Sequence, residues 1–217
     1  MKTLRILLAD DHKIVRQGTR ALLSRIPEWE IIGEAGNGRE AVALSAQLKP
    51  NIVILDIAMP ELNGLDATRQ IKKNSPETEV LIFTGQVTEE LVHDVFSSGA
   101  RSYIVKTDAP DQLIDAVKAL SQHKPFFTSR ISEIVFARYF QEQNELESTP
   151  EKSRITDRER EIVQLLSEGK SNKEVADILG ISVKTAETHR AAIMRKLSLK
   201  SFSDMVRYAI RNKIIEA

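Results

Sequence analysis

Short apolar runs and helix-like segments alternate five times along residues 1–122. The apolar runs have the length and the bounding residues of strands, and they span Leu4–Ala9, Trp29–Ala35, Ile52–Asp56, Glu79–Thr84 and Ser102–Lys106. The other segments repeat apolar residues on one helical face, over Ile14–Ile26, Arg39–Leu48, Leu65–Lys72, Glu89–Ser97 and Pro110–Ser121. This alternation predicts an α/β domain with a doubly wound, five-stranded parallel sheet and helices on both faces.

The pattern changes over residues 123–152, which we predict to be a partly helical linker. Apolar residues follow a helical spacing at Ile131, Ile134, Val135, Ala137 and Phe140. The polar stretch QEQNELESTPEKS comes next and contains a proline, as expected of a tether. The linker therefore separates an α/β domain over residues 1–122 from a second domain over residues 153–217.

Four helices are predicted in the second domain, each with a hydrogen-bonding residue at its start. The first two begin with the S/T-x-x-E pattern, whose side chains satisfy free amides of the first helical turn. The two pairs are Thr156 with Glu159, and Ser171 with Glu174. Gly169 and Gly180 stand where a left-handed residue would end these helices.

The third and fourth helices begin at serines. Ser182 can cap a helix that runs to about Leu197, and Ser201 or Ser203 can cap one that runs to about Arg211. Only the sequence Gly-Ile-Ser, residues 180–182, separates the second helix from the third. A turn this short is typical of a helix-turn-helix, so the second, smaller domain is predicted to be all-α.

Charge is balanced over the chain, with 31 Lys and Arg against 31 Asp and Glu, but not along it. Residues 1–150 hold 17 basic and 21 acidic residues, and residues 151–217 hold 14 and 10. Excess negative charge in the first part of the chain favours metal binding there, and excess positive charge in the second part favours binding to nucleic acid. The absence of cysteine excludes disulfides and thiolate metal sites. No apolar run approaches the roughly 20 residues of a membrane span, so we expect a cytoplasmic protein without a membrane partner.

Five polar residues stand where the predicted strands end: Asp10, Asp11, Asp56, Thr84 and Lys106. The carboxyl ends of parallel strands open on one crevice, so these side chains are expected to converge there. Three neighbouring carboxylates repel one another unless a cation neutralises them, and oxygen ligands favour Mg²⁺ or Mn²⁺ over zinc. Taken alone, Asp11 is equally well explained as the N-cap of the following helix.

These residue types predict phosphoryl transfer. Asp56 is the best candidate nucleophile, because a carboxylate oxygen can accept a phosphoryl group and form an acyl phosphate. Lys106 would pair with the transferred group, and Thr84 would donate a hydrogen bond to one of its oxygens. Each residue alone is common at a strand end, whereas their joint placement favours a phosphorylation site.

Several segments resemble the receiver domain of two-component response regulators: DDHKIVRQG, LDIAMPELNGLDA, LIFTG and GARSYIVK. The segment ITDREREIVQLLSEGKSNKEVADILGISVKTAETHRAAIMRKL resembles the LuxR-type helix-turn-helix. Together they cover nearly the whole chain except the linker, and the combination is typical of the NarL/FixJ family. The resemblance implies a flavodoxin-like receiver followed by a DNA-binding domain.

The resemblance also implies roles for single residues. Asp56 would accept the phosphoryl group from a sensor histidine kinase or a small phosphodonor. Mg²⁺ would be held by Asp10, Asp11, Asp56 and the backbone carbonyl of Ala58. Tyr103 would be an aromatic switch that turns inward when Thr84 moves toward the phosphorylated site; the alternative is an edge-strand tyrosine that only packs.

An enzyme that turns over small phosphorylated substrates is a poorer explanation. Aspartyl-phosphate phosphatases and phosphotransferases of the haloacid dehalogenase type need a second carboxylate two residues after the nucleophile. Here that position is Ala58. We therefore predict no enzymatic activity apart from acceptance of a phosphoryl group and slow autodephosphorylation.

The third helix of the second domain is the predicted recognition helix. On a helical wheel, five residues fall on one side of this helix, and four of the five are able to face the domain core: Val183, Ala186, Arg190, Ile193 and Leu197. The side free to enter a major groove holds Lys184, Thr188, Ala191 and Arg195. From Lys184 to Lys213 there are eight Lys and Arg against two acidic residues. A charge run is often just a solvated face, but helix-turn-helix spacing favours DNA binding here.

Nine residues of this helix are candidate DNA contacts. The expected phosphate contacts are Lys184, Thr185, His189, Arg190, Arg195 and Lys196. The positions that match base-reading residues in relatives are Glu187, Thr188 and Ala191. His189 lacks a partner carboxylate motif, so we interpret it as a phosphate donor or packing residue rather than a metal ligand.

These features predict a phosphorylation-controlled transcription regulator. Phosphorylation of Asp56 is expected to change dimerisation or release the second domain, so that two copies bind half-sites about one helical turn apart. Expected partners are a sensor histidine kinase, double-stranded promoter DNA, a second copy of the chain and RNA polymerase. The alternative is a phosphorylation-dependent protein-interaction switch that no longer reads DNA, against which Lys184, His189, Arg195 and Lys196 argue.

Overall fold

The computed structural model describes residues 3–108, 110–135 and 155–216. The chain forms two compact units, one made mainly by residues 1–59 and 63–146 and the other mainly by residues 147–217. Residues 129–135 are helical, as the apolar spacing of the linker predicts. The predicted helical positions Ala137 and Phe140, and the polar tether after them, lie outside the described residues.

The first unit is built on a parallel sheet with the strand order β2-β1-β3-β4-β5-β6. The strands are β1 (Leu4–Ala9), β2 (Trp29–Ala35), β3 (Ile52–Leu55), β4 (Glu79–Thr84), β5 (Ser102–Val105) and β6 (Phe126–Phe127). From β1 the chain first adds β2 on one side and then adds β3, β4 and β5 on the other. The sheet is therefore doubly wound, as predicted.

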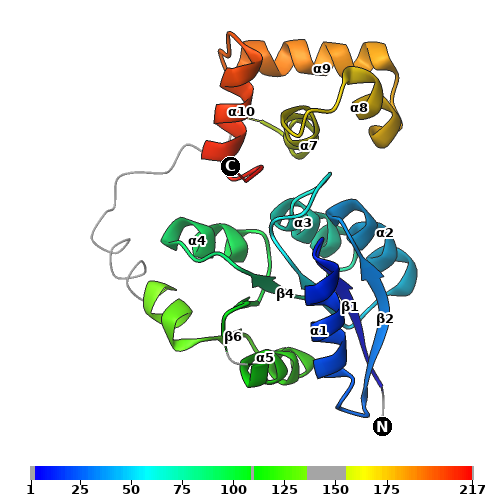
Figure 1. The fold of residues 1–217 in the computed structure, drawn as a ribbon, viewed down its shortest axis with the longest axis vertical. Coiled ribbons are helices and arrows are strands. Elements are labelled where there is room, and N and C mark those ends of the chain that lie inside the picture. The colour runs from blue at the N-terminus through cyan, green and yellow to red at the C-terminus, as the bar shows by residue number, and fades with distance from the viewer. Residues whose placement is uncertain (1–2, 109, 136–154, 217) are drawn as a thin grey trace. The chain divides into compact units, whose positions relative to one another are not determined.

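Helices cover both faces of this sheet (Figure 1). One face carries α1 (Lys13–Leu23) and α5 (Pro110–Ser121), and the other carries α2 (Gly38–Leu48), α3 (Gly64–Asn74) and α4 (Glu89–Ser97). Side chains of α1 and α5 form a core with the strands, including Leu23, Leu113 and Leu120 against Ile6 and Ile54. Burial on both faces explains why the central strands are continuous apolar runs.

The sheet has six strands rather than the predicted five. β6 pairs in parallel with β5, and Ser102 Oγ donates a 3.0 Å hydrogen bond to the Phe126 carbonyl. The ring of Phe127 packs edge-on against that of Phe96 in α4, with the centroids 4.9 Å apart. Two residues are too few to show the alternation or run length of a strand, so this strand depends on contacts distant in sequence.

The start of α1 also differs from one of the sequence-based alternatives. His12, with an extended backbone, is the N-cap residue of α1, and Lys13 is its first residue. Asp11 is therefore not the N-cap, and its carboxylate is free of that structural role. Asp10 Oδ1 accepts a 2.8 Å hydrogen bond from the His12 amide just before the helix begins.

Gly64, the first residue of α3, lies unusually close to the loop that follows β3. A Cβ atom added at Gly64 would lie 2.0 Å from the Asp56 carbonyl oxygen and 2.5 Å from Leu55 Cδ2. The Gly64 amide donates a 2.8 Å hydrogen bond to the Ile57 carbonyl, which holds the two segments together. Only glycine fits this approach of backbone to backbone.

Gly64→Ala is therefore expected to destabilise the first unit by several kcal/mol, since backbone must move to admit the methyl group. The matched control is Gly18→Ala in α1, where an added Cβ meets nothing within 4 Å. This change should raise stability by about 0.5–1 kcal/mol. Urea unfolding followed by Trp29, the single tryptophan of the chain, reports on this unit. Equal effects of the two substitutions would contradict the packing described above.

The second unit consists of α7 (Asp157–Ser167), α8 (Asn172–Leu179), α9 (Val183–Lys196) and α10 (Phe202–Arg211). The predicted capping boxes are present at Thr156 and Ser171, and Ser182 caps α9. Ser201 rather than Ser203 caps α10. Gly180 ends α8 in the left-handed conformation. No helix in the described part of the chain has both the length and the apolar character needed to cross a bilayer.

One predicted core position in α9 is wrong. Ala186 and Ile193 are buried among the other helices, whereas Val183 is 42% exposed. Val183 is the first residue of the helix, where the chain has only just left the turn after α8. A helical wheel gives the direction of a side chain around the helix axis, but not whether that turn of the helix packs against the core. It therefore assigns the first residue of α9 to the core although this end of the helix is exposed.

Candidate functional sites

The ends of the central strands bring the predicted acidic residues together. Ala9 is aligned with Leu55 in the pairing of β1 with β3, so the next residues, Asp10 and Asp56, are neighbours. Hydrogen bonds continue beyond the strands, because the Asp56 amide donates to the Ala9 carbonyl at 2.8 Å. Both carboxylates are nearly buried, at 5% and 3% exposure for the residues. Parallel pairing therefore fixes them at one edge of the sheet.

Lys106 bridges these two carboxylates from the end of β5. Its Nζ lies 2.7 Å from Asp10 Oδ2 and 2.7 Å from Asp56 Oδ2. The second oxygen of Asp56, Oδ1, accepts a 2.8 Å hydrogen bond from the Ile57 amide. One ammonium thus faces two carboxylates, which leaves a net negative charge in the crevice.

The titration behaviour of the site reflects this crowding. Burial, opposed by the hydrogen bond and charge of Lys106, raises the pKa of Asp56 above its usual value, and the Asp10 charge raises it further. For Lys106, burial lowers the pKa, but hydrogen bonds from Lys106 to Asp10 and Asp56 outweigh burial and raise it overall. Lys106 is therefore cationic at neutral pH, while the site opposes ionisation of Asp56 unless further positive charge arrives.

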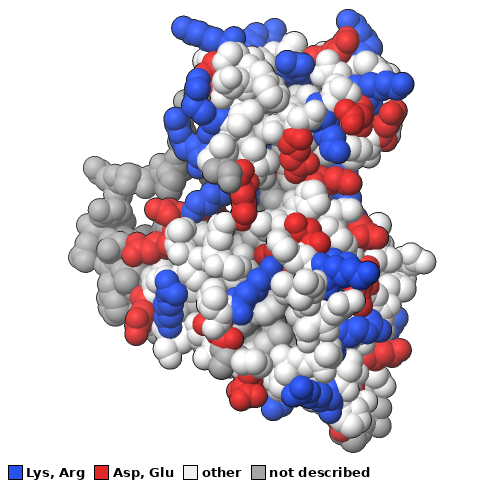
Figure 2. All heavy atoms as spheres, in the orientation of Figure 1, with Lys and Arg blue, Asp and Glu red and all other residues white. Residues whose placement is uncertain are grey.

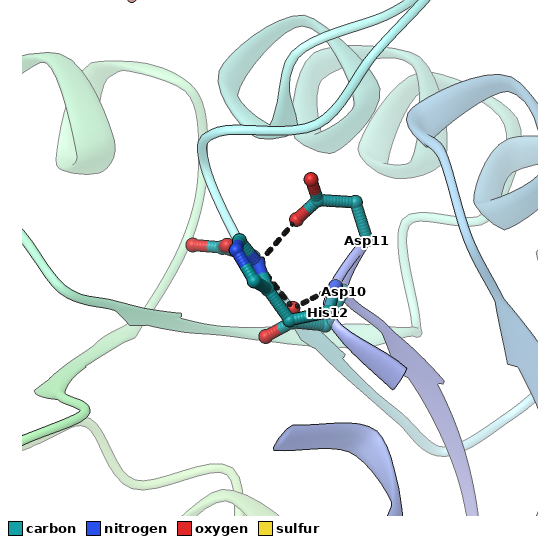
Figure 3. A group of neighbouring side chains, drawn as sticks. Asp10, Asp11 and His12 are labelled. Carbon is teal, nitrogen blue, oxygen red and sulfur yellow. Dashed lines mark hydrogen bonds and ion pairs between the residues drawn. The ribbon is translucent and has the colours of Figure 1, made fainter. Parts of the chain in front are cut away.

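His12 joins the acidic group, although the strand-end pattern did not predict it. Its Nδ1 lies 2.7 Å from Asp11 Oδ1 and 3.4 Å from Asp10 Oδ1 (Figure 3). One ligating atom each of Asp10, Asp11, His12 and Asp56 lies within 4.8 Å of the others. These four residues could together hold a metal ion. A signal was present in the sequence, because His12 directly follows the two aspartates.

The remaining predicted residues of the crevice lie on the adjoining strand ends and loop. Thr84 ends β4, is 1% exposed, and accepts at its carbonyl a 2.8 Å hydrogen bond from the Lys106 amide. Ala58 lies two residues after Asp56 in the loop that leads to α3 and is partly exposed. The structure thus places Thr84 and Lys106 at the ends of neighbouring strands and Ala58 two residues after Asp56.

Tyr103 is fully buried in β5, three residues before Lys106. Its hydroxyl donates a short hydrogen bond to the carbonyl of Gln86, in the loop between β4 and α4. Burial raises the pKa of Tyr103 far above its usual value, with Arg130 acting in the opposite direction. β6 lies beyond β5 in the sheet, so Tyr103 is not on an edge strand. The hydroxyl links β5 to the loop after Thr84.

The predicted recognition helix, α9, presents most of its candidate DNA contacts to solvent. Seven of the nine residues are exposed: Lys184, Thr185, Glu187, Thr188, Ala191, Arg195 and Lys196. His189 and Arg190 are half-buried. Figure 2 shows Lys and Arg side chains along the edge of the second unit that α9 forms.

Two of the expected phosphate contacts have acidic neighbours. Lys196 Nζ lies 2.7 Å from Glu159 Oε2, so the end of α9 is tied to the start of α7. Burial of Glu159 would raise its pKa, but the Lys196 and Thr156 hydrogen bonds lower it overall. Lys184 lies 3.7 Å from Glu187 on the exposed surface. Arg195 lies in the last turn of α9 and is exposed.

Known protein families match both units. The family model of the response regulator receiver domain matches residues 6–118. The family model of bacterial regulatory proteins of the luxR family matches residues 153–209. The chain belongs to the LuxR-type response regulators.

Two relatives match nearly the whole chain, and a solved structure matches about two thirds of it. LiaR, a transcriptional regulatory protein of Bacillus subtilis (strain 168), is 34% identical over 212 residues, which cover 98% of this chain and 99% of LiaR. VraR, a response regulator of Staphylococcus aureus (strain Mu3 / ATCC 700698), is 33% identical and is matched over 99% of this chain and 100% of VraR. A crystal structure of a LuxR-family two-component response regulator from Aurantimonas sp. SI85-9A1 has 32% identity and a TM-score of 0.61, covering 64% of this chain and 99% of that chain.

The bridging position of Lys106 in this response regulator gives a direct stability prediction. Lys106→Met leaves Asp10 and Asp56 buried without their shared cation, which is expected to cost about 3 kcal/mol at neutral pH. Burial raises the pKa of Asp56 in the folded state, so protonation of Asp56 favours folding. The stability difference between Lys106→Met and the wild type should therefore shrink as the pH falls.

The matched control is Lys118→Met on α5, where Lys118 lies 3.5 Å from Asp115 on the exposed surface. Its effect should stay within about 0.5 kcal/mol. Urea unfolding followed by Trp29 compares the two variants in the full chain. A Lys106→Met variant as stable as Lys118→Met would show that Lys106 does not neutralise the crevice.

Proposed function

We propose that Asp56 is phosphorylated by a sensor histidine kinase or a small phosphodonor, and that phosphorylation controls DNA binding by α9. The observation that supports this most is the position of Lys106, 2.7 Å from both Asp10 and Asp56. A nucleophilic carboxylate next to a fixed cation suits attack on a phosphoryl group. Membership of the response regulators supports the same chemistry.

The transfer step follows from the side chains present. A carboxylate oxygen of Asp56 attacks phosphorus, the bond from phosphorus to the donor atom breaks, and the donor leaves with the electron pair. Lys106 pairs with the negatively charged phosphoryl oxygens, and Thr84 donates a hydrogen bond to one of them. Since Ala58 cannot act as a general acid or base, removal of the phosphate is proposed to be slow autodephosphorylation.

The crevice also suits a divalent cation, which we propose to be Mg²⁺ or Mn²⁺. The proposed ligands are Asp10, Asp11, Asp56 and the Ala58 carbonyl. One carboxylate oxygen each of Asp10, Asp11 and Asp56 lies within 4.8 Å of the others. The negative charge of three carboxylates is greater than the single positive charge of Lys106. When bound, the cation would screen the charge of the incoming phosphoryl group. The His12 nitrogen near the same carboxylates is compatible with Mn²⁺.

Metal binding should be visible as stabilisation of the full chain. Mg²⁺ at one hundred times its dissociation constant is expected to add about 2.7 kcal/mol to the stability of the first unit. Asp11→Asn, which leaves the Lys106 bridge intact, should remove most of that gain. Asp115→Asn, on the exposed surface of α5, should keep it. Melting curves of Trp29 fluorescence at constant ionic strength measure the effect, and an equal gain in Asp11→Asn would exclude Asp11 as a ligand.

Phosphorylation is proposed to act through Thr84 and Tyr103. A phosphoryl group on Asp56 adds acceptor oxygens that attract the Thr84 hydroxyl. Tyr103 is tied by its hydroxyl to the Gln86 carbonyl, two residues beyond Thr84. Movement of Thr84 would therefore change the loop that Tyr103 holds, and with it the surface near α4.

The output is proposed to be promoter binding by a dimer. The exposed side of α9 would enter the major groove, with Lys184, Thr185, His189, Arg190, Arg195 and Lys196 at phosphates and with Glu187, Thr188 and Ala191 near base edges. Two copies would bind half-sites about one helical turn apart. RNA polymerase is a further proposed partner, and the cytoplasm the proposed location.

The domain limits remain a proposal as well. We assign residues 1–122 to the receiver, 123–152 to a partly helical linker and 153–217 to the DNA-binding domain. The helical residues 129–135 fit a partly helical linker, although β6 (Phe126–Phe127) in the same stretch pairs with β5 of the receiver sheet. The LuxR-family match begins at residue 153, which is consistent with the second limit.

A further inference from the structure

The side chain of Arg16, in the first turn of α1, contacts Asp10 of the acidic crevice. Its Nη1 donates a short hydrogen bond to the backbone carbonyl of Asp10. Its Nε donates a 3.4 Å hydrogen bond to Oε2 of Glu34, on β2. The side chain is only 16% exposed. Because a planar guanidinium can donate to two acceptors at once, Arg16 links the residue after β1 to the neighbouring strand.

The bond from Arg16 fixes the peptide group that joins the two adjacent aspartates. Asp10 Oδ1 already accepts a 2.8 Å hydrogen bond from the His12 amide, and Oδ2 lies 2.7 Å from Lys106 Nζ. The carbonyl that Arg16 holds belongs to the peptide between Asp10 and Asp11. Since a peptide group is planar, holding its oxygen also sets the direction in which the next residue leaves. Arg16 thus controls how the two carboxylates are oriented relative to each other.

A small hollow of about 10 Å³ shows how closely Arg16 packs against the site. Arg16, Asp10 and Asp56 are among the residues that line it. A space of this size holds no more than about one water molecule. Arg16 is therefore part of the wall of the acidic crevice, and it has no room there for a substrate of its own.

The charge of Arg16 and its position have opposite expected effects on metal binding. A guanidinium repels a cation, so removal of its charge should tighten Mg²⁺ binding slightly if charge dominates. The same holds for Arg20, whose Nη1 lies 2.8 Å from Oε1 of the same Glu34 carboxylate. If the contact with the Asp10 carbonyl dominates, removal of Arg16 should instead weaken Mg²⁺ binding. The sign of the change therefore separates the two roles.

We propose that Arg16 is a positioning residue, which holds the peptide between Asp10 and Asp11 so that both carboxylates bind one cation. Groups that hydrogen-bond to metal-ligating residues orient those ligands and raise the affinity for the metal. Glu34 anchors the guanidinium at its other end. Since this role concerns the same Mg²⁺ and phosphorylation site, it rests on the proposed function.

Arg16→Met tests the role, because it removes both hydrogen bonds and keeps an unbranched side chain. The affinity of the full chain for Mg²⁺ is obtained from melting curves of Trp29 fluorescence over a range of Mg²⁺ concentrations at constant ionic strength. We expect roughly tenfold weaker binding, the lower end of the effect of such outer contacts. Melting without Mg²⁺ records any purely structural loss separately. Phosphorylation by acetyl phosphate should be slow at limiting Mg²⁺ and return close to the wild-type rate at saturating Mg²⁺.

Two further variants complete the design. Arg20→Met is the matched control, since it removes an equal charge from the next turn of α1 and from the same Glu34 carboxylate. Its Mg²⁺ affinity should stay within about twofold of the wild type, as expected for an exposed ion pair. Arg16→Lys keeps the charge but replaces the guanidinium fork by one nitrogen. Its affinity should lie between those of Arg16→Met and the wild type, and it serves as the test if Arg16→Met fails to fold.

The outcomes separate this role from the proposed function. If the wild type binds Mg²⁺ and both Arg16 variants bind it as tightly or more tightly, Arg16 does not position the aspartates. An equal loss of affinity in Arg20→Met would also overturn the proposal, because the contact with Asp10 would then not be the cause. A wild type that gains no stability from Mg²⁺ and accepts no phosphoryl group would overturn the proposed function, and the role of Arg16 with it.

Discussion

Asp56→Asn will abolish acceptance of the phosphoryl group from acetyl phosphate in the presence of Mg²⁺. The amide is a poor nucleophile and cannot form the acyl phosphate, so the expected loss is complete. Intact-protein mass spectrometry under non-acidic conditions measures the added phosphoryl mass. Asp115→Asn, an equal change of charge on an exposed helix, is expected to accept the group at the wild-type rate.

Although Asp56→Asn abolishes phosphorylation, it is expected to raise the stability of the folded protein. The folded pKa of Asp56 is raised chiefly by burial, so the ionised side chain costs stability at neutral pH. A neutral amide of the same shape removes that cost, while Lys106 keeps its ion pair with Asp10. In the absence of Mg²⁺, Asp56→Asn should therefore unfold at a higher urea concentration than the wild type.

If the Asp56→Asn variant is still phosphorylated by acetyl phosphate, the acceptor is another residue.

The double variant Lys184→Ala and Arg195→Ala will lose most of the DNA affinity. Each side chain is exposed on α9 and is proposed to contact a phosphate. Loss of two charge-assisted contacts is expected to weaken binding roughly a hundredfold at low salt. The slope of log K against log salt should also fall by about 2, since two fewer counterions are released.

Arg211→Ala is a control for position: it removes one positive charge, against two in the double variant, from the exposed end of α10 rather than from α9. It should change affinity little and leave the salt slope nearly unaltered. Fluorescence anisotropy with a promoter fragment, at several salt concentrations, gives both quantities. An equal loss in the control would mean that general charge, rather than α9, carries binding.

The receiver fold was predictable because its central strands, such as β3 and β5, are buried on both faces. Such strands appear as continuous apolar runs, and polar residues such as Asp10 and Lys106 mark where they end. Parallel pairing then brings these ends together whatever their separation in sequence. The acidic crevice is therefore predictable from the order of apolar and polar residues alone.

Features that depend on distant contacts were not predictable. β6 has two residues and forms only because β5 offers it an edge. Val183 is exposed because α9 enters the core after its first residue. Glu79, at the start of β4, has Oε1 close to His123 and Arg101, and within the described residues its Oε2 has no hydrogen-bond partner. No local pattern of apolar or polar residues encodes these distances.

The central claim is that phosphorylation of Asp56 controls sequence-selective DNA binding. We would measure binding of the full chain to genomic DNA fragments with and without beryllofluoride and Mg²⁺, at two salt concentrations, for the wild type and Asp56→Asn. Tighter, selective, salt-sensitive binding that needs both beryllofluoride and Asp56 is the predicted result. Selective binding that is indifferent to Asp56, or no selective binding in any state, would contradict the account.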